Sequence, residues 1–252
     1  MRSWLGPSAA ILLLSGCAAL GLFGDSGPPA RPVLDPDLVQ RGAVLFVDPR
    51  LSGDGGRACA SCHPGGGADH LVYLDGESVA PGSAGGRRTI ALRGLYQTAP
   101  YFWDGSAPTV ALAVERMLAV EMRGGVLAGK DREALEAYLL SLAPFDRRRL
   151  EPDGVPVEPS TLSARRGFAV FAKAECTECH PAPAYMRAKL VDIGSGGRFA
   201  IPTLRGVSAA GPFGHDGRWP DLEAAVRANL AASGVELGSD ELNQLLEYLK
   251  LL

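Results

Sequence analysis

Two short segments carry the residues most able to do chemistry. Residues 59–63 read Cys-Ala-Ser-Cys-His, and residues 176–180 read Cys-Thr-Glu-Cys-His. Thiols three residues apart lie on one face of a helical turn, where both can form thioethers to one edge of a haem. The histidine that follows can then bind the iron as its proximal ligand. The pattern is the attachment signature of c-type haem, and it predicts two covalently bound haems. The attaching residues are Cys59, Cys62, Cys176 and Cys179, and the iron ligands are His63 and His180.

Other interpretations of the cysteine pairs fit the sequence less well. A four-cysteine zinc site would have to bring together pairs separated by residues 63–175, and would leave both histidines without a role. Thioredoxin-like redox pairs occur in a βαβ context, which this sequence does not show. The chain has four histidines, and two of them directly follow a cysteine pair, which argues against chance.

The sequence around the motifs repeats. Residues 92–94 and 204–206 are both Leu-Arg-Gly, and residues 100–105 match residues 212–217 at the same offset. We expect each half to begin with an Arg-Gly helix (residues 41–46 and 166–171) and to end with an amphipathic helix (residues 131–142 and 241–252). The predicted fold is mainly α, with two tandem cytochrome c-like haem domains related by an internal repeat.

The N-terminal segment predicts export. A short apolar stretch, residues 9–14, follows Met1-Arg2 and runs into Leu-Ser-Gly-Cys, which resembles the lipobox of bacterial lipoproteins. The resemblance implies a signal peptide over residues 1–16 and lipid on Cys17, which anchors the chain on the periplasmic side of a bacterial membrane. The alternative is an ordinary secretory signal, which also exports the chain.

The rest of the chain divides into four predicted parts. Residues 17–37 read as a flexible stalk, 38–145 as the first haem domain, 146–160 as a linker and 161–252 as the second haem domain. The 252 residues are 46% hydrophobic, which excludes a disordered chain. The net charge of −3 argues against a nucleic-acid partner.

Five segments resemble a known family, the bacterial di-haem cytochrome c peroxidases and their MauG-type relatives. They are residues 46–63, 102–105, 120–122, 202–206 and 215–217, and the resemblance extends over about residues 38–250. It implies a first haem at which hydrogen peroxide reacts and a second haem that relays electrons to it. The expected partner is a small cytochrome c or cupredoxin that donates electrons, together with a possible protein substrate.

The residues expected to handle peroxide depart from the family pattern. The family has a glutamine just before Phe-Trp-Asp-Gly and a glutamate one to two helical turns after it, and these positions fall on Tyr101 and Ala111. Glu115, one turn beyond Ala111, is our candidate for acid–base chemistry, and a solvated helix glutamate is the alternative. Tyr101 can donate a hydrogen bond but is a poor base at neutral pH.

The sixth iron ligands also differ from those of the family. In the second domain the family uses methionine or tyrosine where this chain has Asn229, a weak ligand. The second haem is then five-coordinate, or recruits His215 or Met186, although His215 also suits a buried structural role. Met117 matches Asn229 in the repeat, and it either caps the first haem or packs as a core methionine. His70 receives no assigned role.

A family calcium site is altered as well. The family holds calcium between its domains with an asparagine and backbone carbonyls, but residues 87–89 here are Arg-Arg-Thr. The only asparagines are Asn229 and Asn243. A guanidinium at Arg88 can supply the positive charge instead, so we predict that calcium is not required.

Two classes of function remain open. The first is an enzyme that reduces hydrogen peroxide, or uses it to oxidise a partner protein as the MauG resemblance implies. The second is a plain electron carrier with both irons six-coordinate. The first-domain signature favours the enzyme, whereas Ala111, Asn229 and the availability of Met117 and Met122 favour the carrier. We favour the enzyme.

Overall fold

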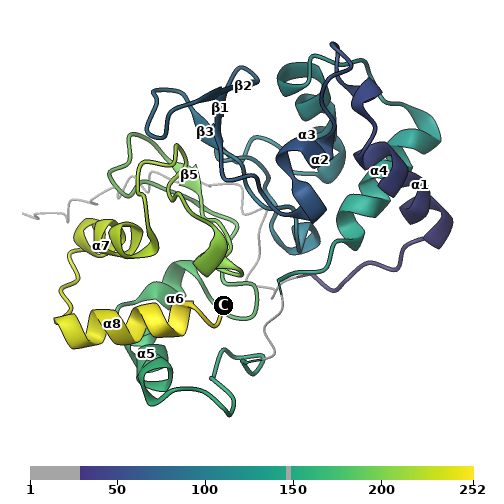
Figure 1. The fold of residues 1–252 in the computed structure, drawn as a ribbon. Helices are drawn as coiled ribbons and strands as arrows, with labels where there is room; N and C mark the ends of the chain where they lie inside the picture. The colour runs from purple at the N-terminus through teal and green to yellow at the C-terminus, as the bar shows by residue number, and fades with distance from the viewer. Residues whose placement is uncertain (1–28, 146–148) are drawn as a thin grey trace, which may run out of the picture.

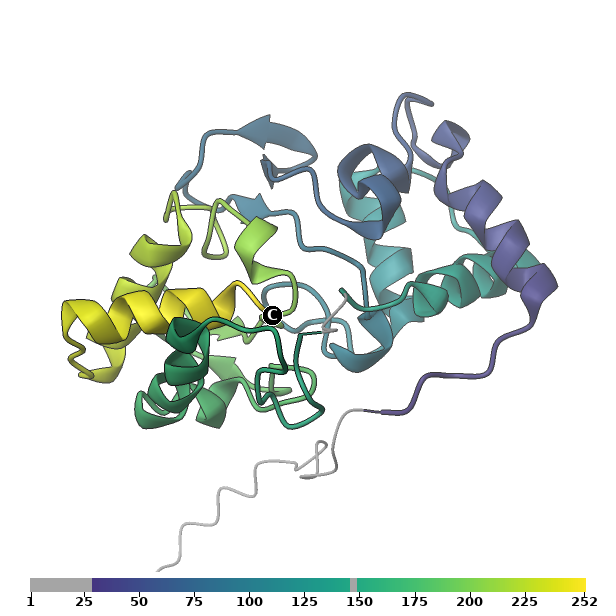
Figure 2. The same cartoon turned by 60° about the horizontal axis from the view of Figure 1, so that its bottom comes forward.

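The computed structural model describes residues 29–145 and 149–252. The helices form two groups that lie side by side (Figures 1 and 2). The first group is α1 (Pro36–Phe46), α2 (Cys59–Cys62), α3 (Val110–Arg116) and α4 (Gly129–Ser141), and the second is α5 (Leu162–Lys173), α6 (Cys176–Cys179), α7 (Leu222–Ser233) and α8 (Ser239–Leu249). The prediction of a mainly helical fold is confirmed.

Short strands and tight turns connect the helices. Strands β1 (Val72–Leu74), β2 (Glu77–Val79) and β3 (Arg87–Arg88) form an antiparallel sheet in the order β2-β1-β3. Strands β4 (Leu190–Val191) and β5 (Phe199–Ala200) form a second antiparallel pair. Short 3-10 turns cover Pro49–Leu51, Pro64–Gly66, Leu95–Gln97 and Val207–Ala209, and a π-helical turn, η4 (Met117–Glu121), follows α3 directly.

Each group is built on one tightly crossed helix pair, α1 with α4 and α5 with α8. A Cβ added at Gly42 would lie 1.9 Å from the Ala134 carbonyl oxygen, and one added at Gly167 would lie 1.9 Å from that of Gln244. These are the glycines of the two Arg-Gly segments. A side chain larger than hydrogen would force the helices apart, so glycine sets the spacing of each pair.

The helices begin where side chains can cap them. Asp35, Thr109, Thr161 and Asp221 each accept a hydrogen bond from a backbone N–H in the first turn that follows. The helix expected over residues 241–252 begins two residues earlier, because the Glu241 carboxylate accepts from the Gly238 N–H at 3.3 Å. It ends at Leu249, and the last residues form a turn in which the Leu252 N–H bonds to the Leu249 carbonyl.

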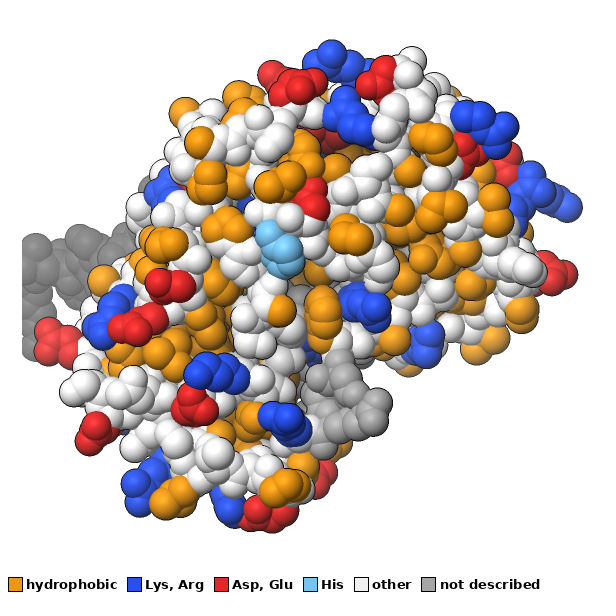
Figure 3. Space-filling model, viewed as in Figure 1, with side chains coloured by type: hydrophobic (Ala, Val, Ile, Leu, Met, Phe, Trp, Pro, Cys, Tyr) orange, Lys and Arg blue, Asp and Glu red, His pale blue; other side chains and the backbone are white. Residues whose placement is uncertain are grey.

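The buried hydrophobic residues form two clusters, one in each helix group. The first-half cluster is Phe46, Leu95, Val110, Val114, Leu118, Met122, Leu135 and Leu139. The second-half cluster is Leu150, Val170, Phe171, Tyr185, Val207, Phe213, Ala225, Leu245, Tyr248, Leu249 and Leu252. On the face drawn in Figure 3, hydrophobic side chains gather over both groups, and charged side chains lie at the rim of the first group but are scattered over the second.

The boundary between the two groups is held by backbone hydrogen bonds. The N–H groups of Gly82 and Arg88 donate to the carbonyls of Asp216 and His215, both at 2.7 Å. In return, the Ala200 N–H donates to the Trp103 carbonyl at 2.7 Å. The segment that carries β3 therefore lies directly against the loop that carries His215.

Part of the predicted organisation lies outside the described residues. This applies to the signal peptide over residues 1–16, to Cys17, to most of the stalk and to residues 146–148 of the linker. Within residues 29–145 and 149–252, no helix has the length and apolar character needed to cross a membrane.

Candidate haem-binding sites

Both cysteine pairs lie on a single helical turn, as the sequence predicts. In α2 the turn closes when the His63 N–H donates to the Cys59 carbonyl at 2.9 Å. In α6 the His180 N–H donates to the Cys176 carbonyl at 2.8 Å. All four thiols are free rather than paired in disulfides. The two turns thus present the same arrangement of two thiols and one imidazole.

The environment of the thiols suits thioether formation better than thiolate chemistry. Burial raises the pKa of both Cys59 and Cys176 to about 11. Reactive cysteines instead have lowered pKa values. In addition, the described part of the chain contains no group of three or more His, Cys, Asp or Glu side chains placed to hold a metal ion. A zinc site built from both cysteine pairs requires such a group.

The two motif histidines are held in the form that an iron ligand needs. His63 Nδ1 lies 3.2 Å from the Gly67 carbonyl oxygen, and His180 Nδ1 lies 2.9 Å from that of Tyr185. Because a carbonyl only accepts, Nδ1 carries the proton and Nε2 keeps its lone pair. Burial lowers the pKa of His63, and lowers that of His180 to about 4, so both rings are neutral. The donor set fits a c-type haem at each motif.

Tyr101 packs on the same hydrophobic cluster as the first motif and is engaged in a hydrogen bond. Its ring packs on the first-half cluster, as does Cys59. The hydroxyl donates to the Leu95 carbonyl at 3.1 Å, and burial raises the pKa of Tyr101 to about 12. The hydroxyl is therefore protonated at neutral pH, and its oxygen retains a lone pair that can accept a further hydrogen bond.

Glu115 lies on the surface of α3. Its Oε1 is 3.2 Å from Arg132 Nη1 on α4, and about half of its side chain is exposed (48%). Ala111, one turn earlier, is partly buried. The structure therefore places Tyr101, partly buried, against the first-half cluster, and Glu115 on the surface with its carboxylate held by an arginine.

Met117 lies where α3 passes into the π-helical turn η4. It is partly buried and packs on the same cluster as Cys59 and Tyr101. A π-helical turn inside a helix is frequent at functional sites. Met122 is buried at the end of this turn, and its backbone N–H donates to the Met117 carbonyl at 3.0 Å.

The structure gives separate contacts to Asn229 and Met186 of the second site, and to His70, which has no assigned role. The Asn229 side chain donates to the Ala225 carbonyl of its own helix at 2.8 Å. Met186 is partly buried and follows Tyr185, whose carbonyl binds His180. His70 is exposed, and its Nδ1 lies 2.8 Å from the Gly211 carbonyl oxygen in the other half.

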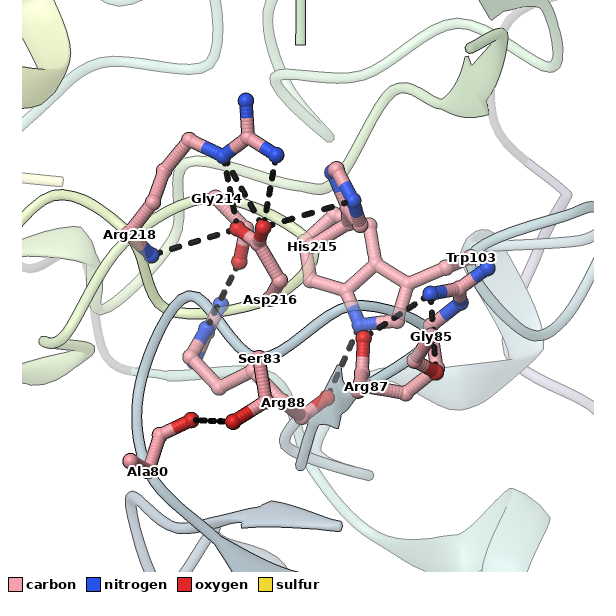
Figure 4. Close-up of polar contacts among 11 residues, drawn as sticks. Ala80, Ser83, Gly85, Arg87, Arg88, Trp103, Gly214, His215, Asp216 and Arg218 are labelled. Carbon is pink, nitrogen blue, oxygen red and sulfur yellow. Dashed lines mark hydrogen bonds and ion pairs between the residues drawn. The ribbon is translucent and has the colours of Figure 1, made fainter. Parts of the chain in front are cut away.

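His215 is buried at the boundary between the halves. Its ring stacks on Phe199 with the centroids 3.7 Å apart and meets Trp103 edge-on at 6.4 Å. Its Nε2 lies 3.7 Å from an Asp216 oxygen, and Asp216 is also bound by Arg218 at 2.7 Å (Figure 4). These contacts favour a structural role for His215, which was one of the two interpretations that the sequence allowed.

Sequence reasoning missed two features of these sites. Trp103 is buried at the boundary, where its Nε1–H donates to the Arg88 carbonyl at 2.8 Å. The repeat already aligned Trp103 with His215, and that alignment was the available signal. Near the first motif, the Tyr73 hydroxyl donates to Asp69 at 2.6 Å and lies beside the Cys62 sulfur. No spacing in the sequence pointed to this group.

Comparison with known proteins identifies a family. The sequence profile of the family described as "Di-haem cytochrome c peroxidase" matches residues 36–145. The methylamine utilization protein MauG of Methylorubrum extorquens is 30% identical over 254 residues, which span 79% of this chain and 70% of that protein. The cytochrome c551 peroxidase of Nitrosomonas europaea is 24% identical, over 86% of this chain and 80% of its own length.

Solved structures show a similar fold. Hydrazine synthase of Kuenenia stuttgartiensis aligns with a TM-score of 0.72 at 22% identity, over 98% of this chain and 100% of the matched chain. The diheme peroxidase BthA of Burkholderia thailandensis aligns with a TM-score of 0.65 at 18% identity, over 86% of each chain. At these identities the likeness concerns the fold alone.

Proposed function

The chain belongs to the di-haem cytochrome c peroxidase and MauG family of haem oxidoreductases, and from this premise we propose that it reduces hydrogen peroxide, or uses it to oxidise a partner, at the first haem motif. Electrons arrive through the second motif. The observation that carries the proposal is the pair of matched turns, each with two thiols and a neutral histidine whose Nδ1 faces a backbone carbonyl. Bound haem iron supplies the exchange of electrons with peroxide.

We assign the second half to electron relay and the first half to peroxide chemistry. The two sequence units are residues 38–145 and 161–252, each with its own hydrophobic cluster. The first unit carries the part of the chain that matches the family profile. A small cytochrome c or cupredoxin is the proposed donor, because such proteins exchange single electrons through small, short-lived contacts.

The chain's own residues can manage the protons of this reaction. Glu115 is exposed, so it can exchange a proton with water, and we assign it the acid–base role at the first site. Tyr101 lies deeper, in the cluster shared with Cys59, and we assign it a hydrogen bond to the bound oxidant. For this role the Glu115 carboxylate has to leave Arg132, because the ion pair otherwise holds it.

The location follows from the N-terminal sequence. We propose that the chain is exported to the periplasmic side and anchored there as a lipoprotein through Cys17. The support is the apolar stretch followed by the lipobox-like Leu-Ser-Gly-Cys. Export also agrees with covalent haem attachment at the two motifs.

The alternative function is electron transfer without catalysis. It is favoured by the packing of Met117 on the cluster shared with Cys59, since a thioether from this position would close the first iron. It is also favoured by Ala111, which has no acid–base group. In this case the protein would pass electrons between partners and would not consume peroxide.

The test is consumption of hydrogen peroxide by the haem-loaded protein with a reduced small cytochrome c as donor. We expect peroxide-dependent oxidation of the donor by the wild type. Variant H63A should lose it together with the iron ligand. The matched control is H70A, since His70 lies on the same segment but is exposed and bonds to the Gly211 carbonyl. Absence of turnover in the wild type would favour the electron carrier.

A further inference from the structure

Arg88 is a buried positive charge at the boundary between the two halves. The residue is 8% exposed, and within the described part of the chain its guanidinium forms no ion pair. It donates instead to the carbonyl oxygens of Ala210 at 2.9 Å, Thr89 at 3.2 Å and Gly214 at 3.4 Å. Burial lowers the pKa of Arg88 to about 10, which leaves it charged at neutral pH. Two of the three carbonyls belong to the second half.

The backbone of Arg88 extends the same junction. Its N–H donates to the His215 carbonyl at 2.7 Å, and its carbonyl accepts the Trp103 indole N–H at 2.8 Å. The guanidinium carbon also lies 5.5 Å from the centroid of the Trp103 ring. Arg88 therefore contacts the indole of Trp103 and the loop of residues 210–215 at once (Figure 4).

This arrangement does not fit the calcium ion of the family. Calcium takes six to eight oxygen ligands, whereas three carbonyls at this boundary, those of Thr89, Ala210 and Gly214, bind a guanidinium. The family resemblance places the asparagine of that site within residues 87–89, which are Arg-Arg-Thr in this chain. The chain's two asparagines lie elsewhere, on α7 and α8.

We propose that Arg88 is a built-in cation that takes the place of a divalent metal and fixes Trp103 of the first half against the His215 loop of the second. Arg88 is then a positioning residue that sets the arrangement of the two haem motifs. A planar guanidinium with five N–H donors can bind several carbonyls at once, which the compact ammonium of lysine does less well. The inference needs both motifs to hold haem, but it does not need the protein to consume peroxide.

The wild-type holoprotein gives the first test. Its thermal unfolding and the rate of electron transfer between the two haems should be the same in EGTA and in millimolar calcium chloride. A lower melting temperature or slower transfer in EGTA, restored by calcium, would overturn the proposal. This comparison needs no variant, so it stands whatever the variants do.

Variants of the two neighbouring arginines give the second test. We expect R88Q to melt about 5 °C lower and to transfer electrons between the haems about tenfold more slowly, in EGTA or calcium alike. The matched control is R87Q, because Arg87 is exposed and donates to the Gly85 and Gly86 carbonyls of its own turn. Its guanidinium carbon lies 5.4 Å from the centroid of the Phe199 ring, so the control keeps the buried carbonyl contacts of Arg88 and changes only this exposed contact with the second half. If R88Q matches R87Q in both measurements, the proposal is wrong.

If R88Q does not fold, Arg88→Lys provides a second variant for the same measurements. It keeps the charge and should fold, with electron transfer between the haems slower than in the wild type. Equal transfer in R88K and the wild type would show that the guanidinium has no positioning role. None of these measurements uses peroxide. If the protein is independent of metal but does not consume peroxide, the positioning role of Arg88 is supported and the proposed function is contradicted.

Discussion

Trp103 and His215 occupy matching positions in the two repeated sequence segments, and their rings meet at the boundary between the halves, with centroids 6.4 Å apart and planes at 70°. Both side chains are buried. Arg88 contacts both, through the Trp103 indole and the His215 carbonyl. The halves therefore meet at equivalent residues of the sequence repeat.

The indole N–H of Trp103 should contribute to the stability of this boundary. The substitution W103F removes the donor and leaves the Arg88 carbonyl without it, which should cost about 1–3 kcal/mol of unfolding free energy. Chemical denaturation of the holoprotein would measure the change. W219F is the control, because Trp219 is only partly buried, at the rim of the second-half cluster. If both variants lose the same unfolding free energy, the indole N–H of Trp103 does not stabilise the boundary in particular.

Removal of the Tyr101 hydroxyl should reduce activity more than stability. Y101F breaks the hydrogen bond to the Leu95 carbonyl, which should cost about 1 kcal/mol. If the hydroxyl contacts the oxidant, peroxide turnover should fall by about 10²-fold. The rate of peroxide consumption and the melting temperature would be measured on the same preparation. A large loss of stability with unchanged turnover would assign Tyr101 to the core alone.

Glu115 can be tested against a neighbour that binds the same arginine. E115Q should lower peroxide turnover by about 10²-fold and alter unfolding free energy by less than about 1 kcal/mol, because the Arg132 pair is exposed. E136Q is the control, since Glu136 lies 3.7 Å from Arg132 on the same helix. If peroxide turnover falls equally in both variants, the loss comes from the changed surroundings of Arg132, and Glu115 has no acid–base role.

Whether Met117 binds the first iron distinguishes an enzyme from an electron carrier. If the first iron is open, M117L should leave the optical spectrum of the oxidised protein unchanged, because leucine preserves the packing on the first-half cluster. M122L is the control, since Met122 is buried at the end of the same π-helical turn. Conversion of a low-spin to a high-spin spectrum in M117L alone would identify Met117 as an iron ligand and favour the carrier.

The features that sequence reasoning predicted best are local ones. The two cysteine turns and their histidines follow from spacing within five residues, and the Arg-Gly segments do form helices α1 and α5. The helix ends differed by up to five residues, as at α1, which begins at Pro36 rather than at residue 41. Capping contacts, such as those of Asp35 with Asp37 and of Glu241 with Gly238, decide where the helices begin.

The features it missed depend on contacts between distant segments. Glu115 was placed on the correct helix, but its ion pair with Arg132 depends on how α3 lies beside α4. The cation role of Arg88 was suggested by its type and position. Its contacts with Trp103, Ala210 and Gly214 join segments up to 126 residues apart, and periodicity within one segment cannot show such contacts.

The central claim is that the first site is an open iron that reacts with peroxide. The most direct measurement is the EPR spectrum of the haem-loaded protein, as isolated and after half-reduction, before and after one equivalent of hydrogen peroxide. We predict a high-spin iron signal that is lost when peroxide is added, accompanied by oxidation of the second haem. Two low-spin irons that ignore peroxide in every redox state would contradict the account and make the chain an electron relay.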